Sequence, residues 1–478
     1  MEKIVACIDK TRVLMVYPKI PTTYWSFEYA LPFVGSKSVM PPLGLLTVAA
    51  LLPDRYHVSL VDCNVRALTP GDILASDIVF VSAMLVQKES FDEVVALCNQ
   101  CHVPVAVGGP YPTSAMESIA GVDFFILNEG ELTLPRFIAD WEKGCPERVY
   151  RDEAKPDLSL TPPPRYDLVN PGDYSNLALQ LSRGCPFSCE FCDIIQLFGR
   201  VPRYKGEEQF LRELDAVYAT GYRGSIFIVD DNFIGSPVKV KRVLRAMTAW
   251  QEEHGYPFTF FTEASINLAR DDELMDCMGK AACEMVFLGI ETPDTATLAS
   301  TGKMQNLKDD LLDSVKRIQA KGLQVMAGFI IGFDTDTEDI FDRQLAFIEQ
   351  AGIPLAMMGM LIALPGTALA QRLEREGRLL GPTSGNNTHD LTVNFRTSMP
   401  EEILKKGYLR VLKELYRPKN YFRRCVCMLK RLPNNRFARK ISRPLVKQDW
   451  IALFKSIRTQ AFSRYGASYF MFLLRAMI

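Results

Sequence analysis

The chain has 478 residues, a formal net charge of −1 and 48% hydrophobic residues, which is typical of a globular protein of about two to four domains. No window approaches the roughly 20 uninterrupted apolar residues of a membrane span, so the sequence excludes an integral membrane protein. The twelve cysteines form no paired framework and the first ten residues contain no long apolar run. These features exclude a disulfide-stabilised secreted domain and predict a cytoplasmic protein.

The first 150 residues predict an α/β domain of the Rossmann-like, flavodoxin-like kind. Short runs rich in β-branched residues recur at residues 13–17, 58–62, 78–82, 103–107 and 124–127, with helical spacing between them. Such runs are typical of parallel strands that are buried on both faces. Ligands bind these sheets outside the carboxyl ends of the strands. The candidate binding residues therefore follow three of the strands: Ser82, Ala83 and Met84; Gly108, Gly109 and Pro110; and Glu129 and Gly130.

Residues 151–176 predict a stiff linker between domains. Pro156, Pro162, Pro163, Pro164 and Pro171 fall in this stretch, which has no sustained hydrophobic period. We therefore expect four parts: residues 1–150, the linker, a second α/β domain at 177–370 and a basic, mainly helical domain at 371–478.

Three closely spaced cysteines begin the second α/β domain. Cys185, Cys189 and Cys192 form a CxxxCxxC pattern without a fourth cysteine nearby. Tetrahedral zinc sites close on four ligands, and cubane iron–sulfur clusters usually do too, so one metal position is left open here. An open iron can chelate a substrate or cofactor. Two alternatives stay open: a zinc knuckle that borrows Cys145 or Cys283, and three unrelated thiols.

This cysteine pattern, with Phe191 before its third cysteine, resembles the signature of radical S-adenosylmethionine (radical SAM) enzymes. The order of a Rossmann-like domain, a proline-rich bridge and a radical SAM core is similar to the cobalamin-binding class, whose first domain holds vitamin B12. Residues 39–46 and 61–66 resemble the branch that contains the hopanoid C-2 methylases. The likeness covers most of the chain and implies a B12-dependent enzyme.

One feature departs from some B12 domains. Their Asp-x-His-x-x-Gly motif, which ligates cobalt, is absent, because His57, His102, His254 and His389 all lack that context. Many radical SAM relatives also lack the motif and leave the lower cobalt face without a ligand. The resemblance therefore still implies cobalamin, and the alternative is an amino-terminal domain with a purely structural role.

Six strand–helix units follow the linker. The strands are expected at residues 178–183, 225–229, 258–262, 285–288, 324–331 and 355–364, and one helix is expected to open at Thr335 with a capping box to Glu338. Six units are too few for a closed eight-stranded barrel. They suit the six-stranded (β/α)6 partial TIM barrel of the radical SAM fold, with its active site at the carboxyl ends of the strands.

The resemblance implies roles for the residues at those ends. The three cysteines would ligate a 4Fe-4S cluster, and S-adenosylmethionine (SAM) would bind beside it. Residues near the SAM amino group, ribose and adenine would be Phe191, Asp230, Asp231, Asn232, Glu263, Ser265, Glu291, Ile330 and Gly332. Taken singly, each has a simpler explanation, because such carboxylates are as often salt-bridged at the surface and such glycines usually accommodate packing.

The implied reaction is methylation of an unactivated carbon. The reduced cluster would cleave SAM to a 5'-deoxyadenosyl radical, that radical would take a hydrogen atom from the substrate, and methylcobalamin would supply the methyl group. The implied partners are a small-molecule or lipid substrate and a one-electron reductant such as ferredoxin or flavodoxin. The alternative is a radical SAM enzyme that couples, cyclises or oxidises its substrate without methyl transfer. A non-catalytic iron–sulfur or corrinoid sensor is a further alternative.

The carboxyl-terminal part differs in charge from the rest. From Leu404 onward it contains 19 lysines and arginines, among them Arg439 and Lys440, against only Glu414 and Asp449. Basic stretches interleaved with aromatic residues suit anionic lipid surfaces, which predicts peripheral contact with the inner face of the membrane and supports a lipid or isoprenoid substrate. The alternative is a helical appendage that docks on the acidic body of its own chain. Nucleic acid is not expected as a partner.

Overall fold

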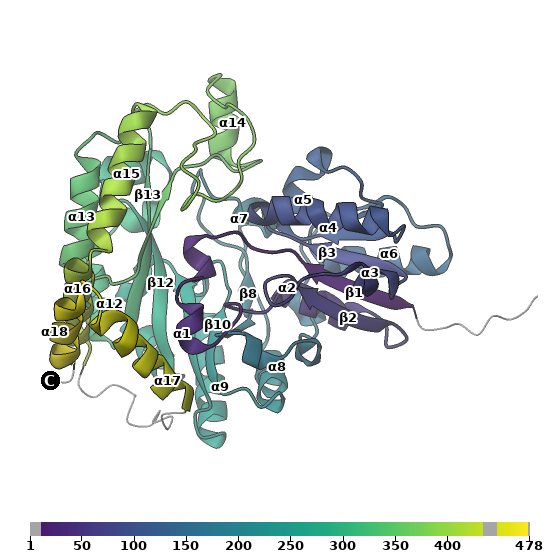
Figure 1. Ribbon diagram of the computed structural model, residues 1–478, viewed down its shortest axis with the longest axis horizontal. Helices are drawn as coiled ribbons and strands as arrows, with labels where there is room; N and C mark the ends of the chain where they lie inside the picture. Colours follow the sequence, from purple (N-terminus) through teal and green to yellow (C-terminus); the bar gives the residue numbers. More distant parts are fainter. Residues whose placement is uncertain (1–10, 434–446, 477–478) are drawn as a thin grey trace, which may run out of the picture. The chain divides into compact units, whose positions relative to one another are not determined.

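The computed structural model describes residues 11–433 and 447–476 and divides the chain into two compact units (Figure 1). The first unit contains the residues up to Pro21 together with Pro41–Asp173, and the second contains Thr22–Met40 and the chain from Tyr174 onward. Within the described residues, no helix combines the length and the apolar character that a membrane span needs. Arg439 and Lys440 of the basic stretch lie outside the described residues.

The first unit is a doubly wound parallel sheet with the order β2-β1-β3-β4-β5-β6. Its strands are β1 (Arg12–Tyr17), β2 (His57–Asp62), β3 (Ile78–Ser82), β4 (Val105–Gly108), β5 (Phe124–Ile126) and β6 (Val149–Tyr150). Its helices are α2 (Leu43–Leu51), α3 (Pro70–Leu74), α4 (Lys88–Gln100), α5 (Pro110–Ala115) and α6 (Gly130–Glu142). The five expected strands are confirmed. Strand β6 was not expected, because a strand of two residues carries no periodic signal.

Helices cover both faces of this sheet because successive strand residues point to opposite sides. Leu14 and Val16 of β1 belong to a buried cluster with Phe91 of α4. Val13 and Met15 of the same strand belong to a second cluster, which includes side chains of α2 and α6. This arrangement explains why the strands read as continuous apolar runs.

The second unit contains the predicted partial barrel, a six-stranded parallel sheet with the order β14-β13-β12-β11-β10-β7. Its strands are β7 (Leu177–Leu179), β10 (Gly224–Ile228), β11 (Phe258–Ala264), β12 (Cys283–Glu291), β13 (Gln324–Ile331) and β14 (Ala356–Met360). The short strands β8 (Ser182–Arg183) and β9 (Arg203–Tyr204) pair separately, in antiparallel orientation. All six expected strands are present, and β7 and β14 form the two open edges.

Burial alternates along the barrel strands in a way that identifies the lumen. On β10, Ile226 and Ile228 are fully buried, whereas Phe227 between them keeps partial exposure. On β12, Val286 and Leu288 are fully buried and Phe287 is part-exposed. The buried set faces the surrounding helices and the part-exposed set faces the lumen. The lumen is therefore less tightly filled than the outer layer.

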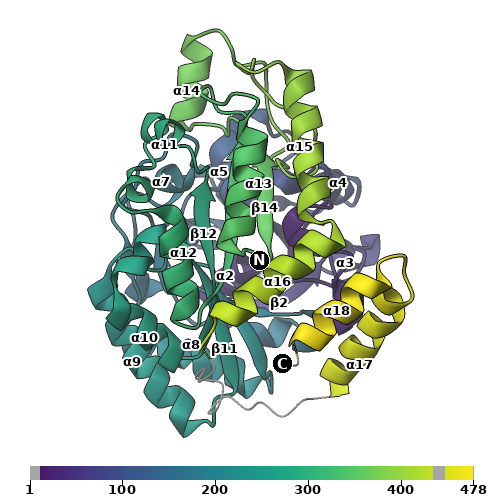
Figure 2. The same cartoon turned by 90° about the vertical axis from the view of Figure 1, so that its left-hand side faces the viewer.

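Helices surround the barrel on its outer face, and Figure 2 shows α12, α13 and α15 along it. The helices that follow the strands are α7 (Ile194–Leu197), α8 (Glu207–Ala219), α9 (Pro237–Glu253), α10 (Asp272–Lys280), α11 (Thr295–Ser300), α12 (Leu311–Ala320), α13 (Ile340–Ala351) and α14 (Ala368–Arg375). The expectation that a helix opens at Thr335 is wrong, because α13 begins at Ile340 after Asp339. The Thr335 hydroxyl instead shares a 2.6 Å hydrogen bond with that of Thr297.

Residues 22–40, which we call the closing segment, connect the two open edges of the barrel. At one end, the Tyr24 amide donates to Thr388 Oγ1 at 3.1 Å, and the Tyr24 hydroxyl meets that of Tyr416, which also donates to the Ala356 carbonyl on β14. At the other end, Asn176, just before β7, donates its amide to the Val39 carbonyl at 2.9 Å. The helix α1 (Leu31–Val34) lies between these ends. This part of the amino-terminal sequence therefore completes the second unit.

Two pairs of helices end the described chain. In α15 (Glu401–Leu415) and α16 (Pro418–Arg431), Arg410 pairs with Asp342 of α13, while Arg423 and Arg424 both pair with Glu349. The Arg424 side chain is fully buried. The first part of the basic stretch thus docks on acidic residues of its own chain. The helices α17 (Lys447–Ser456) and α18 (Gly466–Ala476) follow.

Candidate active site

The three cysteines lie on one loop after β8. Gly184, just before Cys185, has a φ of +95°, and a side chain there would come within 2.9 Å of the Gly199 carbonyl oxygen, so glycine is required. The Cys192 amide donates to the Cys189 carbonyl at 3.2 Å and curls the loop. Burial raises the pKa of Cys185, and it raises that of Cys192 to about 12. Thiolate therefore forms here when a metal displaces the proton.

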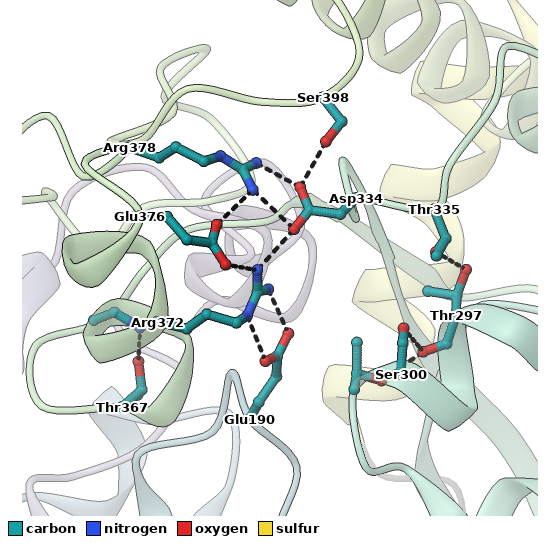
Figure 3. A network of polar contacts seen from close by, with 12 residues as sticks. Glu190, Thr297, Ser300, Asp334, Thr335, Thr367, Arg372, Glu376, Arg378 and Ser398 are labelled. Atoms are coloured by element: carbon teal, nitrogen blue, oxygen red, sulfur yellow. Dashed lines mark hydrogen bonds and ion pairs between the residues drawn. The ribbon is translucent and has the colours of Figure 1, made fainter.

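Charged side chains clamp this loop through Glu190 (Figure 3). The guanidinium of Arg372 on α14 donates to both Glu190 carboxylate oxygens, at 3.1 and 3.0 Å. Arg372 also pairs with Asp334, which follows β13, and Asp334 in turn pairs with Arg378. The Glu190 backbone is held as well, since its amide donates to Thr301 and its carbonyl accepts from Leu369. The cysteine loop is therefore fixed by elements from three distant parts of the chain.

Carboxylates gather at the carboxyl ends of three neighbouring strands. Glu263 of β11 and Asp231 after β10 are part-buried, and removal from water raises the pKa of each to about 7. Mutual repulsion with Asp231 and Glu291 adds to the shift at Glu263. Carboxylates held close together without enough cations favour a ligand that carries positive charge. The sulfonium and ammonium of SAM meet this requirement.

Glu291 at the end of β12 pairs with a lysine that the sequence did not single out. Lys303 Nζ lies 2.6 Å from Glu291 Oε1, and both side chains are nearly buried. Glu291 has a φ of +65°, a strained conformation for a residue with a side chain. Attraction by Glu291, Cys189 and Cys192 raises the pKa of Lys303 despite its burial, which on its own would lower it. The ammonium is thus charged and lies beside the cysteine loop.

Lys303 belongs to a turn that approaches the cysteine loop. Gln305 Nε2 lies 3.7 Å from Cys189 Sγ, and the Gln305 side chain is buried. Asn306 ties the turn to β12 by donating to the carbonyls of Gly289 and Ile290 at 3.1 and 3.0 Å. No sequence signal pointed to these residues, because single Lys, Gln and Asn side chains after a helix are most often at the surface.

Other expected SAM residues have structural partners. The Asp230 carboxylate is buried and accepts from the Leu181 amide and the Ser182 hydroxyl, at 2.7 and 2.5 Å. Asn232 Oδ1 accepts from the amide and hydroxyl of Ser265, both at 3.2 Å. These bonds connect the ends of neighbouring strands. They place Asp230, Asn232 and Ser265 at the expected edge of the barrel, and their contact with SAM stays a prediction.

The remaining expected residues also lie near the cysteine loop or at the end of β13. The rings of Phe191 and Phe333 contact each other at 5.9 Å between centroids. Ile330 packs beside the same cluster of side chains. Gly332 has a φ of +101° and donates its amide to Asp336 at 2.8 Å. The sequence therefore predicted residues that the fold gathers at one end of the barrel.

In the first unit, glycines let two loops approach at the ends of β3 and β4. Gly109 has a φ of +89°, and a side chain there would meet Ser82 Oγ at 2.5 Å and the Ala83 carbonyl at 3.3 Å. The Tyr111 amide donates to the Ala83 carbonyl and fixes the start of α5. Met84 is exposed, and Glu129 before α6 is buried. The strand order reverses between β1 and β3, where sheets of this topology bind ligands.

Comparison with family models agrees with this architecture. Residues 33–138 match the B12 binding domain, residues 179–348 match the radical SAM superfamily, and residues 367–478 match a domain of unknown function, DUF4070. Solved structures of similar fold include TsrM, a radical SAM methyltransferase from Kitasatospora setae with cobalamin and an iron–sulfur cluster bound. Its TM-score is 0.67 at 14% identity, with 94% of this chain and 100% of that chain covered. The cobalamin-dependent radical enzyme OxsB gives a TM-score of 0.65 at 17% identity, with 96% of this chain and 74% of that chain covered.

Curated relatives are similar over most of both chains. An uncharacterized methyltransferase of Synechocystis sp., sll1242, is 48% identical over 88% of this chain and 79% of its own length. The hopanoid C-2 methylase of Rhodopseudomonas palustris is 35% identical over 83% of this chain and 78% of its own length. The chain therefore belongs to the cobalamin-dependent radical SAM methyltransferase family, whose cofactors are a 4Fe-4S cluster, SAM and cobalamin.

Proposed function

We propose that this methyltransferase acts on an unactivated carbon of a lipid or isoprenoid substrate that binds in the lumen of the partial barrel. The observation that carries the proposal is a layer of aromatic rings in the lumen, next to the carboxylates at the carboxyl ends of the strands. Phe227 and Phe261 stack at 4.6 Å between centroids with their planes 4° apart, and Phe287 contacts Trp25 of the closing segment at 5.0 Å. These side chains face the lumen without complete burial. An apolar molecule would gain free energy by covering them.

Gly328 of the neighbouring strand β13 lets the Phe287 ring pack closely against the backbone of the barrel. A side chain at Gly328 of β13 would come within 3.0 Å of the Phe287 ring. The relative from Rhodopseudomonas palustris is named for methylation of a hopanoid, which is an apolar polycyclic lipid. The aromatic layer and this relative together favour an apolar substrate over a charged metabolite.

The proposal gives each group of residues a task. Cys185, Cys189 and Cys192 hold the cluster, Asp231, Glu263 and Glu291 face the positive charges of SAM, and the aromatic layer keeps water from the reacting carbon. The bound cofactors supply hydrogen-atom abstraction and the methyl group. The loops that begin at Ser82, Gly108 and Glu129 hold cobalamin in the first unit.

We further propose the partners of the reaction. A one-electron donor such as ferredoxin or flavodoxin reduces the cluster. The basic carboxyl-terminal part brings the enzyme to the anionic inner face of the membrane, where a lipid substrate resides. Lysines and arginines near such a surface each contribute about 1 kcal/mol of binding free energy.

Isotope transfer from SAM tests the proposed reaction. The anaerobically reconstituted enzyme is given a reductant, an isoprenoid lipid extract and SAM with a deuterated methyl group. We expect the deuterated methyl group in an apolar lipid product, together with 5'-deoxyadenosine. Deoxyadenosine with an altered but unlabelled product would instead support coupling, cyclisation or oxidation. A labelled water-soluble product would contradict the lipid substrate.

A further inference from the structure

Exposed apolar side chains are concentrated at the carboxyl terminus. Of the 21 large apolar side chains that are exposed in the described part of the chain, nine lie between Trp450 and Leu474. Phe462 is 86% exposed and Phe454 is 65% exposed. Scattered exposed apolar residues are normal, but such a concentration marks a binding surface.

The helix α18 has two apolar faces, and only one of them is packed. Phe472 stacks on Phe422 of α16 at 4.9 Å between centroids, and Tyr469 on the same side is buried. Phe470 and Leu474 project from the other side, with 50% and 63% exposure. The packed face holds the helix on the body of the second unit, so the second face is presented outward.

The charge of this region identifies the chemistry of its partner. No acidic residue occurs from Trp450 to the end of the sequence, whereas Lys455, Arg458, Arg464 and Arg475 are present. These four side chains are exposed. Upstream, by contrast, Arg410 and Arg423 pair with acidic residues of α13. A surface that is both apolar and exclusively basic fits an anionic lipid bilayer.

The same surface extends to the closing segment of the barrel. The helix α17 contacts α1, as Figure 1 shows, and Lys455 Nζ donates to the Pro32 carbonyl at 2.9 Å. Tyr29 and Val34, on either side of Pro32, are 81% and 46% exposed. Trp25 of the same segment contacts Phe287 in the lumen. One short segment therefore connects the exposed apolar surface with the interior of the barrel.

We propose that residues 450–456 of α17, the helix α18, and the exposed side chains of Tyr29 and Val34, together called the lipid-facing surface, dock on an anionic bilayer. An apolar substrate then passes between the bilayer and the lumen beside the closing segment, at the side of the barrel between β14 and β7. This inference rests on the proposed function for the identity of the substrate. The surface itself is independent of any catalytic step.

Vesicle binding by the full chain tests the docking. We expect the protein to float with anionic vesicles and to float much less with neutral ones. Vesicles with brominated acyl chains should quench the fluorescence of Trp450. The variant Trp450→Phe, which lacks this tryptophan, should therefore show less quenching than the wild type. The triple change Phe454→Ser, Phe470→Ser and Leu474→Ser should abolish flotation. The matched control, Val201→Ser, Val238→Ser and Leu380→Ser, alters equally exposed side chains elsewhere and should float as the wild type does. Equal flotation of both triple variants would overturn the proposal.

A second probe tests the route to the lumen. Anionic vesicles that contain a brominated fatty acid should quench the fluorescence of Trp25. The variant Trp25→Phe should lack this part of the quenching. The triple variant at Phe454, Phe470 and Leu474 should lack it too, because it does not bind the vesicles. Quenching of Trp450 without quenching of Trp25 would overturn the route. Quenching of both residues with no deuterated methyl group in any lipid would leave the route standing and refute the proposed function.

Discussion

The side chain of Gln305 offers a direct way to test the environment of the cluster. Its amide nitrogen lies 3.7 Å from Cys189 Sγ, and a hydrogen bond to a ligating sulfur stabilises the extra negative charge of a reduced cluster. We predict that Gln305→Leu shifts the midpoint potential of the reconstituted cluster to a more negative value, measured by redox titration with electron paramagnetic resonance. Gln371→Leu, at an exposed glutamine on α14, should not shift it. Equal potentials in the two variants would contradict this prediction.

The carboxylates at the strand ends predict a pH dependence for SAM binding. Desolvation, with repulsion from Asp231 and Glu291, raises the pKa of Glu263 to about 7, so this group is largely protonated at pH 6 and ionised at pH 8. A cationic ligand favours the ionised form, so the affinity for SAM should rise with pH, by at most about tenfold per pH unit for one proton. Calorimetric titration at several pH values checks this expectation. Glu263→Gln should flatten the profile, and an unchanged profile in that variant would contradict the assignment.

At the residue scale, the sequence predicted what is locally encoded. The cysteine spacing is a short-range pattern, so Cys185, Cys189 and Cys192 could be identified without a structure. Lys303 and Gln305 could not, because they lie more than a hundred residues further along the chain and approach the cysteines only through folding. Asp230 was found as a polar residue after a strand, but its bonds to Leu181 and Ser182 became visible only in the structure.

The clamp on the cysteine loop can be tested at the scale of an element. Arg372 of α14 joins Glu190 to Asp334, and α14 lies in the region that matches a domain of unknown function. We predict that Arg372→Leu lowers the free energy of unfolding by about 1 kcal/mol, because part-exposed ion pairs contribute stability of this size. It should also lower the iron content after reconstitution, because the loop loses its anchor. Arg375→Leu on the same helix is the control. Equal iron content in the two variants would refute the role of the clamp.

Strands were more predictable than their surroundings for a physical reason. A strand buried on both faces needs a continuous apolar run, which a single sequence displays. The start of α13 was misplaced because the Thr335 hydroxyl bonds to Thr297, a contact that local capping rules do not include. The closing segment was also missed, since its partners Thr388 and Tyr416 are more than 360 residues away.

At the scale of the whole molecule, the two units divide the cofactors between them, and a change in one unit should spare the other. A side chain at Gly109 would meet Ser82 at 2.5 Å, in addition to a strain of about 1–3 kcal/mol from the positive φ. We predict that Gly109→Val loses cobalamin, measured by its absorption spectrum, and retains cleavage of SAM. Gly144 has a similar φ of +74°, but a side chain there would meet no other atom. Gly144→Ala therefore measures the effect of backbone strain without the steric clash that Gly109→Val adds. Loss of both cobalamin binding and SAM cleavage in Gly109→Val would contradict the division of the cofactors between the two units.

Formation of 5'-deoxyadenosine by the anaerobically reconstituted protein, supplied with SAM and dithionite, shows whether the three cysteines hold a cluster that cleaves SAM. We expect the wild-type protein to form 5'-deoxyadenosine and Cys189→Ala, which removes one of three cluster ligands, not to form it. Replacing Cys283, which lies outside the cysteine loop, should leave the yield unchanged. A protein that binds zinc in place of iron and sulfide, or a Cys189→Ala variant that still cleaves SAM, would show that these cysteines do not ligate a SAM-cleaving cluster.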